Sequence, residues 1–183
     1  QQKSKKIFIY IFFLIIIGTI NNKNFDNVNF TNVKKIYVKG LDEKKNLELI
    51  KKLDFLKVNN LFFLNEYKLT KTLNSNNLIE NFSVFKIYPS TLDIKIKKTN
   101  FLAQLKKDDN IFFLGSNGKL TKTTETKIDI PFIIGDFKIK SFFKLKKTID
   151  ESNFSYNEIN NLYFFKSGRW DIETNKGLLI KLP

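Results

Sequence analysis

The side chains that most often do covalent chemistry are scarce in this chain. Its 183 residues include no His and no Cys, which excludes thiolate nucleophiles, iron–sulfur clusters, thiolate–zinc sites and triads built on an imidazole base. The neighbouring carboxylates Asp108 and Asp109 remain as candidate acid and base catalysts. Adjacent residues of a strand or tight turn point apart, however, and no acid or base partner lies nearby. We therefore expect a polar turn there, and predict no enzymatic activity, no metal and no cofactor.

Arg169 and Trp170 are the candidate partner-binding residues. Arg169 is the only arginine among 32 basic residues, and its planar guanidinium suits bidentate pairing with a partner's carboxylate. An ion pair within the protein, with Asp171 or Glu173, is the competing interpretation. Trp170 is the only tryptophan. Tryptophan is common in interface hot spots, but within a strand it more often packs in the core, and we favour that interpretation.

The formal net charge of +14 is typical of a protein that binds nucleic acid. Almost all of the basic residues are lysines, which lack the bidentate fork that reads phosphates and base edges. Lys86, Lys95, Lys97 and Lys98 lie on or near two expected strands and could face acidic partners or lipid headgroups. We favour a solvated face that discourages edge pairing. We predict no nucleic-acid partner and no small-molecule substrate; a membrane-anchored nucleic-acid binder is the disfavoured third class.

An uncharged run of fourteen residues, 7–20, predicts a membrane anchor. As a helix it would be about 21 Å long, short of a hydrocarbon core of about 30 Å, so flanking Lys and Asn side chains must reach the interfaces. We prefer an uncleaved signal anchor over residues 7–22 to a signal peptide, because no small-x-small cleavage site follows. A buried soluble helix is disfavoured because the run is apolar all round. The anchor residues are Ile7, Phe8, Ile11, Phe12, Leu14, Ile15 and Ile17.

The charges around this run predict its orientation. Three lysines precede it and one follows closely, so the positive-inside rule places residues 1–6 in the cytoplasm as a short tail. Residues 23–32 are then a linker, and all that follows lies across the membrane. Because the chain contains no Met, we expect it to be part of a longer protein, with residues before Gln1 and after Pro183.

Residues 33–98 predict the element order β-α-α-β-β. Leucines at helical spacing predict two helices, with Asp42 and Asn65 at their N-caps. A strand precedes the helices and another follows them. The last strand is half-buried, because Leu92, Ile94 and Ile96 alternate with polar residues. These elements form a small sheet with two helices on one side.

Residues 99–183 predict a mostly antiparallel β-domain with one or two helices. Hairpin turns are expected at residues 106–110, 115–118 and 175–177. Apolar residues at helical spacing predict one helix over residues 142–149. Ser155 and Glu158 could form a capping box before a second helix, although the apolar residues that follow favour a strand.

The motifs that join these elements resemble those of the FtsQ/DivIB family of bacterial cell-division proteins. The family has an early strand that ends in Gly, then a strand followed by Tyr-Pro and Leu-x-Ile, which match Gly40, Tyr88, Pro89, Leu92 and Ile94. Further matches are Ala103 and Leu105, Phe113-Leu114 and Gly118, Pro131 to Gly135, Gly168 to Ile172, Asn175, Gly177 and Leu182-Pro183. The chain departs from the family at Lys98, Phe101 and Ile130, and the family's distal domain continues beyond the position of Pro183.

The resemblance implies an α+β fold with an N-terminal transmembrane helix. A POTRA domain at residues 33–98 and a β-domain at residues 99–183, without its C-terminal part, would follow. It implies a single-pass inner-membrane scaffold of the divisome, with a cytoplasmic N-terminus and periplasmic domains enriched at the septum. Its partners would be FtsB and FtsL homologues and other septal proteins, bound through a sheet edge, with the residue matching Arg169 near the FtsB-binding face. The alternative is another POTRA-containing protein that assists export or assembly of membrane proteins.

Overall fold

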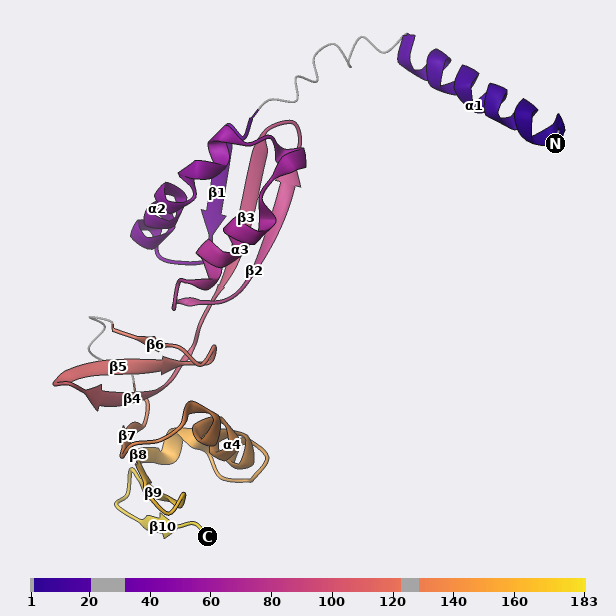
Figure 1. The fold of residues 1–183 in the computed structure, drawn as a ribbon. Helices are drawn as coiled ribbons and strands as arrows, with labels where there is room; N and C mark the ends of the chain where they lie inside the picture. Colours follow the sequence, from indigo (N-terminus) through magenta and orange to yellow (C-terminus); the bar gives the residue numbers. More distant parts are fainter. Residues whose placement is uncertain (1, 21–31, 123–128) are drawn as a thin grey trace.

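The computed structural model describes residues 2–20, 32–122 and 129–183, in which one helix is followed by two units built on separate sheets (Figure 1). The predicted linker lies outside the described residues except for Asn32, and so do Asn21 and Asn22 at the end of the predicted anchor. The N-terminal helix α1 spans Gln2–Ile20.

No helix among the described residues combines the length and the apolar character that a membrane crossing requires. The transmembrane helix predicted over residues 7–22 is therefore not found. The helix present begins earlier, at Gln2, and so includes Lys3, Lys5 and Lys6 together with the apolar run.

The first unit has the predicted order β-α-α-β-β. Its sheet has the strand order β1-β3-β2, in which β1 is parallel and β2 antiparallel to the central β3. Two short 3₁₀ segments lie between the helices. The elements are β1 (Lys35–Lys39), α2 (Glu43–Lys52), η1 (Asp54–Val58), η2 (Leu61–Phe63), α3 (Glu66–Asn74), β2 (Ile79–Ile87) and β3 (Thr91–Lys98).

The core of the first unit lies between this sheet and the helices α2 and α3, which cover one of its faces (Figure 1). Leu92, Ile94 and Ile96 of β3 are buried, as the alternation predicts. Asn65 caps α3 by accepting a hydrogen bond from the backbone N–H of Lys68 at 2.9 Å. Asp42 occupies the N-cap position of α2, but its carboxylate makes no cap bond and binds Lys45 Nζ at 2.8 Å instead.

Gly40 ends β1 in a conformation that a side chain would not tolerate. Its φ is +119°, and a Cβ atom built on it would lie 1.9 Å from the backbone oxygen of Ile96. The loop from β1 to α2 thus passes directly against β3, so that the absence of a side chain is required there.

The second unit is a seven-stranded sheet with the order β10-β9-β8-β7-β4-β5-β6. Strand β7 runs parallel to both of its neighbours and the other pairings are antiparallel, which confirms the mostly antiparallel β-rich region. The elements are β4 (Phe101–Lys107), β5 (Asn110–Gly115), β6 (Leu120–Thr121), β7 (Phe132–Ile134), α4 (Ile139–Asp150), η3 (Tyr156–Glu158), β8 (Ile159–Phe164), β9 (Trp170–Thr174) and β10 (Leu179–Lys181).

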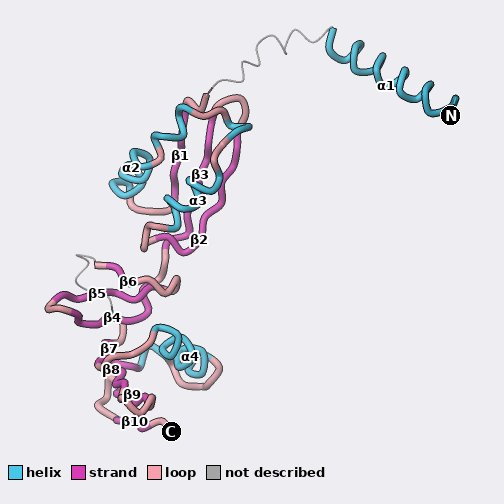
Figure 2. The backbone as a smooth tube through the Cα atoms, in the orientation of Figure 1, coloured by secondary structure: helices cyan, strands magenta, loops and turns pink. Residues whose placement is uncertain are grey.

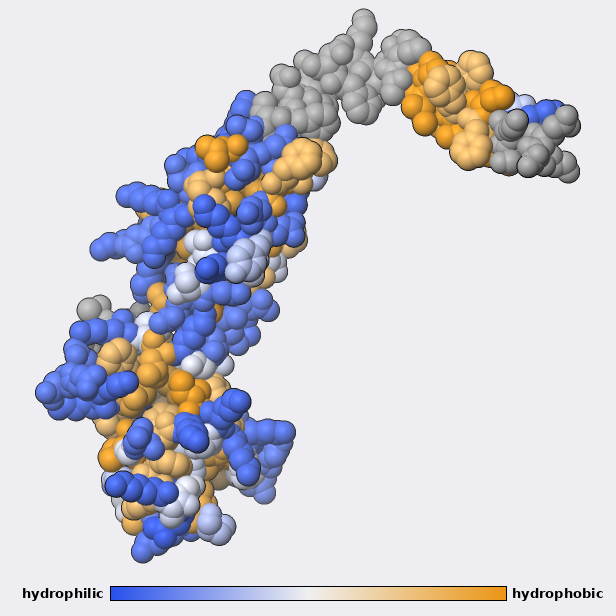
Figure 3. Space-filling model, viewed as in Figure 1, coloured by the Kyte–Doolittle hydropathy of each residue, from blue (hydrophilic) through white to orange (hydrophobic). Residues whose placement is uncertain are grey.

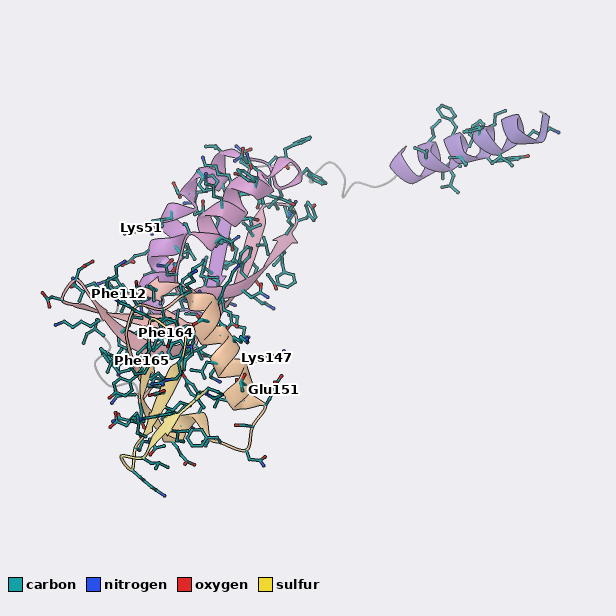
Figure 4. All side chains as sticks on the ribbon, turned by 60° about the horizontal axis from the view of Figure 1, so that its bottom comes forward. Lys51, Phe112, Lys147, Glu151, Phe164 and Phe165 are labelled. Atoms are coloured by element: carbon teal, nitrogen blue, oxygen red, sulfur yellow. The ribbon has the colours of Figure 1, made fainter. Side chains whose placement is uncertain are left out.

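Strand dominates this second unit, with α4 as its one long helix within the described residues (Figure 2). Phe142, Leu145 and Ile149 of α4 are buried against the sheet, as their spacing predicts. Lys147 and Glu151 lie on the outer side of the helix, away from the sheet (Figure 4). The Ser155 side chain makes no cap bond, and only one 3₁₀ turn precedes the strand β8, so the strand interpretation is confirmed.

Candidate functional site

The pair Asp108 and Asp109 forms the two-residue turn between β4 and β5. Both residues have positive φ, 46° and 58°, as a tight hairpin requires, and the flanking Lys107 and Asn110 are paired across it. The Asp109 carboxylate is exposed and lies 2.8 Å from Lys106 Nζ. The prediction of a polar turn is confirmed, and these carboxylates do not converge on a site.

Trp170 belongs to the core of the second unit. It is buried at the start of β9, and its ring centroid lies 4.8 Å from that of Phe164 and 5.7 Å from that of Phe137. The core interpretation of this tryptophan is therefore confirmed. One edge of Trp170 also reaches a surface groove between α4 and the chain beyond β10, lined among others by Leu145 and Leu182, so its contribution to partner binding stays a prediction.

Arg169 lies on the other side of the sheet from Trp170 and pairs within the chain. Its Nε atom lies 3.0 Å from Asp171 Oδ1, and its Nη2 donates to Oδ2 at 3.3 Å. The guanidinium also stacks over Phe165, 4.8 Å from the ring centroid. The Asp171 side chain is 4% exposed, whereas that of Arg169 is 41% exposed. The structure thus does not bring Arg169 and Trp170 together, although the Arg169 side chain stays partly exposed.

Beside Arg169, three polar side chains form a network that sequence reasoning missed. Glu173 Oε2 accepts hydrogen bonds from Tyr163 Oη at 2.6 Å and from Asn161 Nδ2 at 2.9 Å. The hydrogen bond from Tyr163, followed by that from Asn161, lowers the pKa of Glu173 below its ordinary value. The same contact raises the pKa of Tyr163. The sequence signal for this face is the alternation of Asp171 and Glu173 with the apolar Trp170 and Ile172 along β9.

Strand β10 lies at one end of the second sheet within the described residues. The backbone N–H of Thr174 donates to Leu178 O at 2.9 Å, and that of Leu182 donates to Trp170 O at 3.1 Å. Because the bonding direction alternates along an antiparallel strand, the backbone groups of Leu179 and Lys181 point away from β9. No strand in the described ranges pairs with this outer edge.

The edge of β10 and the adjacent polar face together form the candidate functional site. Leu178 and Leu179 are exposed large apolar residues at this edge. Leu179 also lines a shallow pocket with Tyr163, Phe165, Asp171 and Glu173. An open edge beside an apolar and polar pocket can accept an added strand, because main-chain bonds supply affinity and the pocket supplies specificity.

The five motif residues predicted as the POTRA signature lie in the first unit and serve its architecture. Gly40 ends β1, and Leu92 and Ile94 are fully buried in β3. Tyr88 and Pro89 begin the turn from β2 to β3, and the ring of Tyr88 lies 4.8 Å from that of Phe62. Their positions match a role in turn and core formation; their status as a family signature stays a prediction.

Comparison with known proteins adds three findings. Residues 31–98 match the model of the FtsQ-type POTRA domain. The chain is 30% identical over 91 residues to the cell division protein DivIB of Clostridium acetobutylicum, a match that covers 50% of this chain and 36% of that protein. It is also 30% identical over 130 residues to DivIB of Clostridium botulinum, which covers 69% of this chain and 49% of that protein.

A solved structure also aligns with part of this chain. The major extracytoplasmic domain of DivIB from Geobacillus stearothermophilus aligns with 47% of this chain and 79% of its own length, with a TM-score of 0.37 and 15% sequence identity. The chain spans about a third to a half of the length of the two clostridial relatives. The POTRA match and the two relatives agree with the sequence motifs, and the chain belongs to the FtsQ/DivIB family of bacterial cell-division proteins.

Proposed function

We propose that this protein is a membrane-anchored scaffold of the bacterial division machinery that recruits and regulates septal proteins. The proposal rests on the family and on the surface around β10 with its exposed Leu178 and Leu179. A scaffold needs surfaces that accept partner chains. The pocket beside β10 is the observation that carries the proposal, since apolar and polar groups of Leu179, Tyr163 and Glu173 line it together and can hold side chains of a partner.

The proposed partners are homologues of FtsB and FtsL, and the proposed role of Arg169 is to pair with an acidic partner side chain. The exposed part of its guanidinium supports this role, because Asp171 occupies only one side of the planar group. A carboxylate of the partner strand could then bind the free N–H groups.

The proposed attachment is to the inner membrane through α1, with the N-terminus in the cytoplasm and both sheet units in the periplasm. Every described side chain from Ile7 to Ile15 is apolar or aromatic and exposed. Exposure of this kind around the whole helix favours an apolar environment. The lysines before the run favour the cytoplasmic side for the N-terminus.

Co-purification of the full-length protein with its FtsB and FtsL homologues tests the proposed function. We expect a complex that survives purification from membranes. Failure of the full-length protein to co-purify with either homologue would contradict the scaffold role.

Two substitutions locate the binding surface. Lys181→Pro removes an outward-facing N–H of β10, while the preceding residue Ile180 is already in the extended conformation that proline requires. We expect Lys181→Pro to weaken partner capture strongly and Arg169→Glu to weaken it by about tenfold or more, the scale of a lost charge-assisted pair. Lys166→Glu, a charge reversal in the turn before β9, is the control. Unchanged binding by Arg169→Glu removes that residue from the interface.

A further inference from the structure

One end of the first unit exposes a group of apolar side chains that its core does not use. Phe63 is 84% exposed and Val58 is 75% exposed. Phe62, Ile87 and Tyr88 are about half exposed beside them. We call these five residues the apolar end.

Three segments of the chain meet to form the apolar end. The backbone N–H of Val33 donates to Asn59 O at 3.0 Å, and that of Lys34 donates to Ser90 O at 2.8 Å. The rings of Phe62 and Tyr88 lie 4.8 Å apart. The end therefore lies where β1 begins, and Figure 3 shows apolar side chains on this end of the unit among hydrophilic neighbours.

The two phenylalanine rings point outward because the leucines next to them in the chain already fill the core. Leu61 and Leu64 flank the two phenylalanines and are buried, at 0% and 8% exposure. The segment thus directs its leucines inward and Phe62 and Phe63 outward. Exposed apolar side chains grouped in this way mark an interaction surface.

The surroundings of the apolar end are basic. Lys34 and Lys35 follow Val33 and are exposed. Lys57 adjoins Val58, and its Nζ lies 2.5 Å from Asp54 Oδ1. Lys86 precedes Ile87 in the chain and pairs with Glu66 at 2.9 Å. Apolar and aromatic groups with lysines nearby fit the interface of a membrane that contains anionic lipids, where rings sit at headgroup depth and lysines bind phosphates.

The covalent link to α1 favours the membrane as the occupant. Twelve residue steps separate Ile20, the last residue of α1, from Asn32 at the start of the first unit. Such a segment reaches about 40 Å at most, even when fully extended. If α1 attaches to a membrane, the apolar end is held near the same surface, and its effective concentration there is high.

We propose that the apolar end docks on the membrane surface, with Phe62, Phe63 and Val58 in the lipid interface and the nearby lysines on anionic headgroups. This inference rests on the proposed attachment of α1. It would hold the POTRA unit on the bilayer and leave the edge of β10, in the other unit, available to partners.

The absence of native cysteines allows a test with single labelled sites in the full chain. Phe63→Cys, Leu178→Cys and Ile11→Cys each receive an environment-sensitive fluorophore, and the protein is reconstituted in vesicles that contain phosphatidylglycerol and a lipid-attached quencher. Leu178 is the matched control, since it is an exposed apolar residue at the edge of the other unit. We expect quenching at positions 63 and 11 and none at position 178.

The pattern of quenching separates the two proposals. Quenching at position 11 without quenching at 63 overturns the docking of the apolar end and leaves the anchor in place, whereas no quenching at 11 overturns the anchor. Shielding at 63 that grows with protein density, without lipid quenching, identifies a second copy as the occupant and overturns the inference. Replacing phosphatidylglycerol with phosphatidylcholine should reduce quenching at 63 but not at 11, and equal quenching contradicts the role of the lysines.

Discussion

In the first unit two helices pack on a sheet of three strands, whereas in the second unit one α-helix packs on a sheet of seven strands. The buried residues of the first unit are all Val, Ile or Leu. Those of the second include Phe142 and Trp170, and the three buried polar residues among the described ranges, Thr99, Asp171 and Thr174, all follow the first unit. One core is entirely aliphatic, and the other adds two aromatic side chains and is bordered by polar groups.

The number of helices that cover each sheet explains this difference. Two helices can shield one face of a small sheet fully, so its inward side chains need only be apolar. A single helix cannot shield the whole of a wide sheet, and the opposite face of β9 carries Asp171 and Glu173, which find partners within the same face. The buried polar side chains consequently lie outside the first unit.

The largest expected effect concerns Gly40 of the first unit. Gly40→Ala places a Cβ 1.9 Å from a backbone oxygen of β3 at positive φ, so we expect a loss of about 5 kcal/mol or more of unfolding free energy. Gly168→Ala in the second unit is the control, because Gly168 also has positive φ but no atom within 4 Å of its Cβ position; about 1 kcal/mol is expected there. Urea unfolding followed by circular dichroism measures both. Equal losses would contradict the close approach of the Gly40 loop to β3.

The next effect is the loss of stability when a buried position in one of the two cores is emptied. Phe142→Ala should cost about 3–5 kcal/mol and Leu73→Ala about 2–5 kcal/mol, because each empties a fully buried position. Hydrogen exchange resolved by residue should show each loss confined to its own unit, with Leu162 and Leu92 as reporters of the second and first cores. Equal loss of protection in both units would show that the two cores unfold as one.

A substitution at Asp171 measures how much the buried ion pair with Arg169 stabilises the second unit. Asp171→Asn keeps the shape of the side chain but removes the charge that Arg169 faces, and we expect a loss of about 1–3 kcal/mol. Lys45→Gln in the first unit is the contrast, since solvent screens its pairing with the exposed Asp42 and the loss should be the smaller one. Thermal unfolding measures both variants. A larger loss of unfolding free energy in Lys45→Gln than in Asp171→Asn would contradict the larger contribution expected from the buried ion pair.

The smallest effect is in the titration of two carboxyl groups. Lys45 and then Lys98 lower the pKa of Asp42, and hydrogen bonds from uncharged Tyr163 and Asn161 lower that of Glu173. Both groups therefore stabilise the fold above their unfolded pKa, and the contribution is lost as the pH falls through the folded pKa. In about 1 M salt the Debye length is about 3 Å, so the pKa of Asp42 should rise and the pKa of Glu173 should stay unchanged. NMR titration measures both pKa values.

Tyr163→Phe provides the complementary measurement. It removes the main hydrogen bond to Glu173, so the pKa of Glu173 should rise toward its ordinary value at any salt concentration. The pKa of Asp42 is the internal control. A salt-dependent pKa of Glu173 in the unmodified protein would show that charges, and not the neutral donors, hold it low.

Local pattern was sufficient for the elements with strong periodicity. The alternation of Leu92, Ile94 and Ile96 and the spacing of Phe142, Leu145 and Ile149 each predicted the correct element, because burial on one face fixes the period. The turn at Asp108 was also predicted correctly, because it depends only on residues that are adjacent in the chain. The predicted N-cap of α2 was wrong in detail, because the Asp42 carboxylate binds Lys45 and not the backbone N–H groups of the helix. Both partners are within reach, and the sequence does not decide between them.

By itself, the sequence determined the α+β class, the β-α-α-β-β order and the family motifs, since each depends on residues close together in the chain. Only the tertiary structure decided where side chains from distant segments meet. It placed Asn117 Nδ2 within 2.9 Å of Ile79 O, turned Arg169 and Trp170 to opposite faces, and grouped Phe62 with Tyr88. These contacts join residues whose distance apart depends on sheet order and register, which are set by packing across the whole unit.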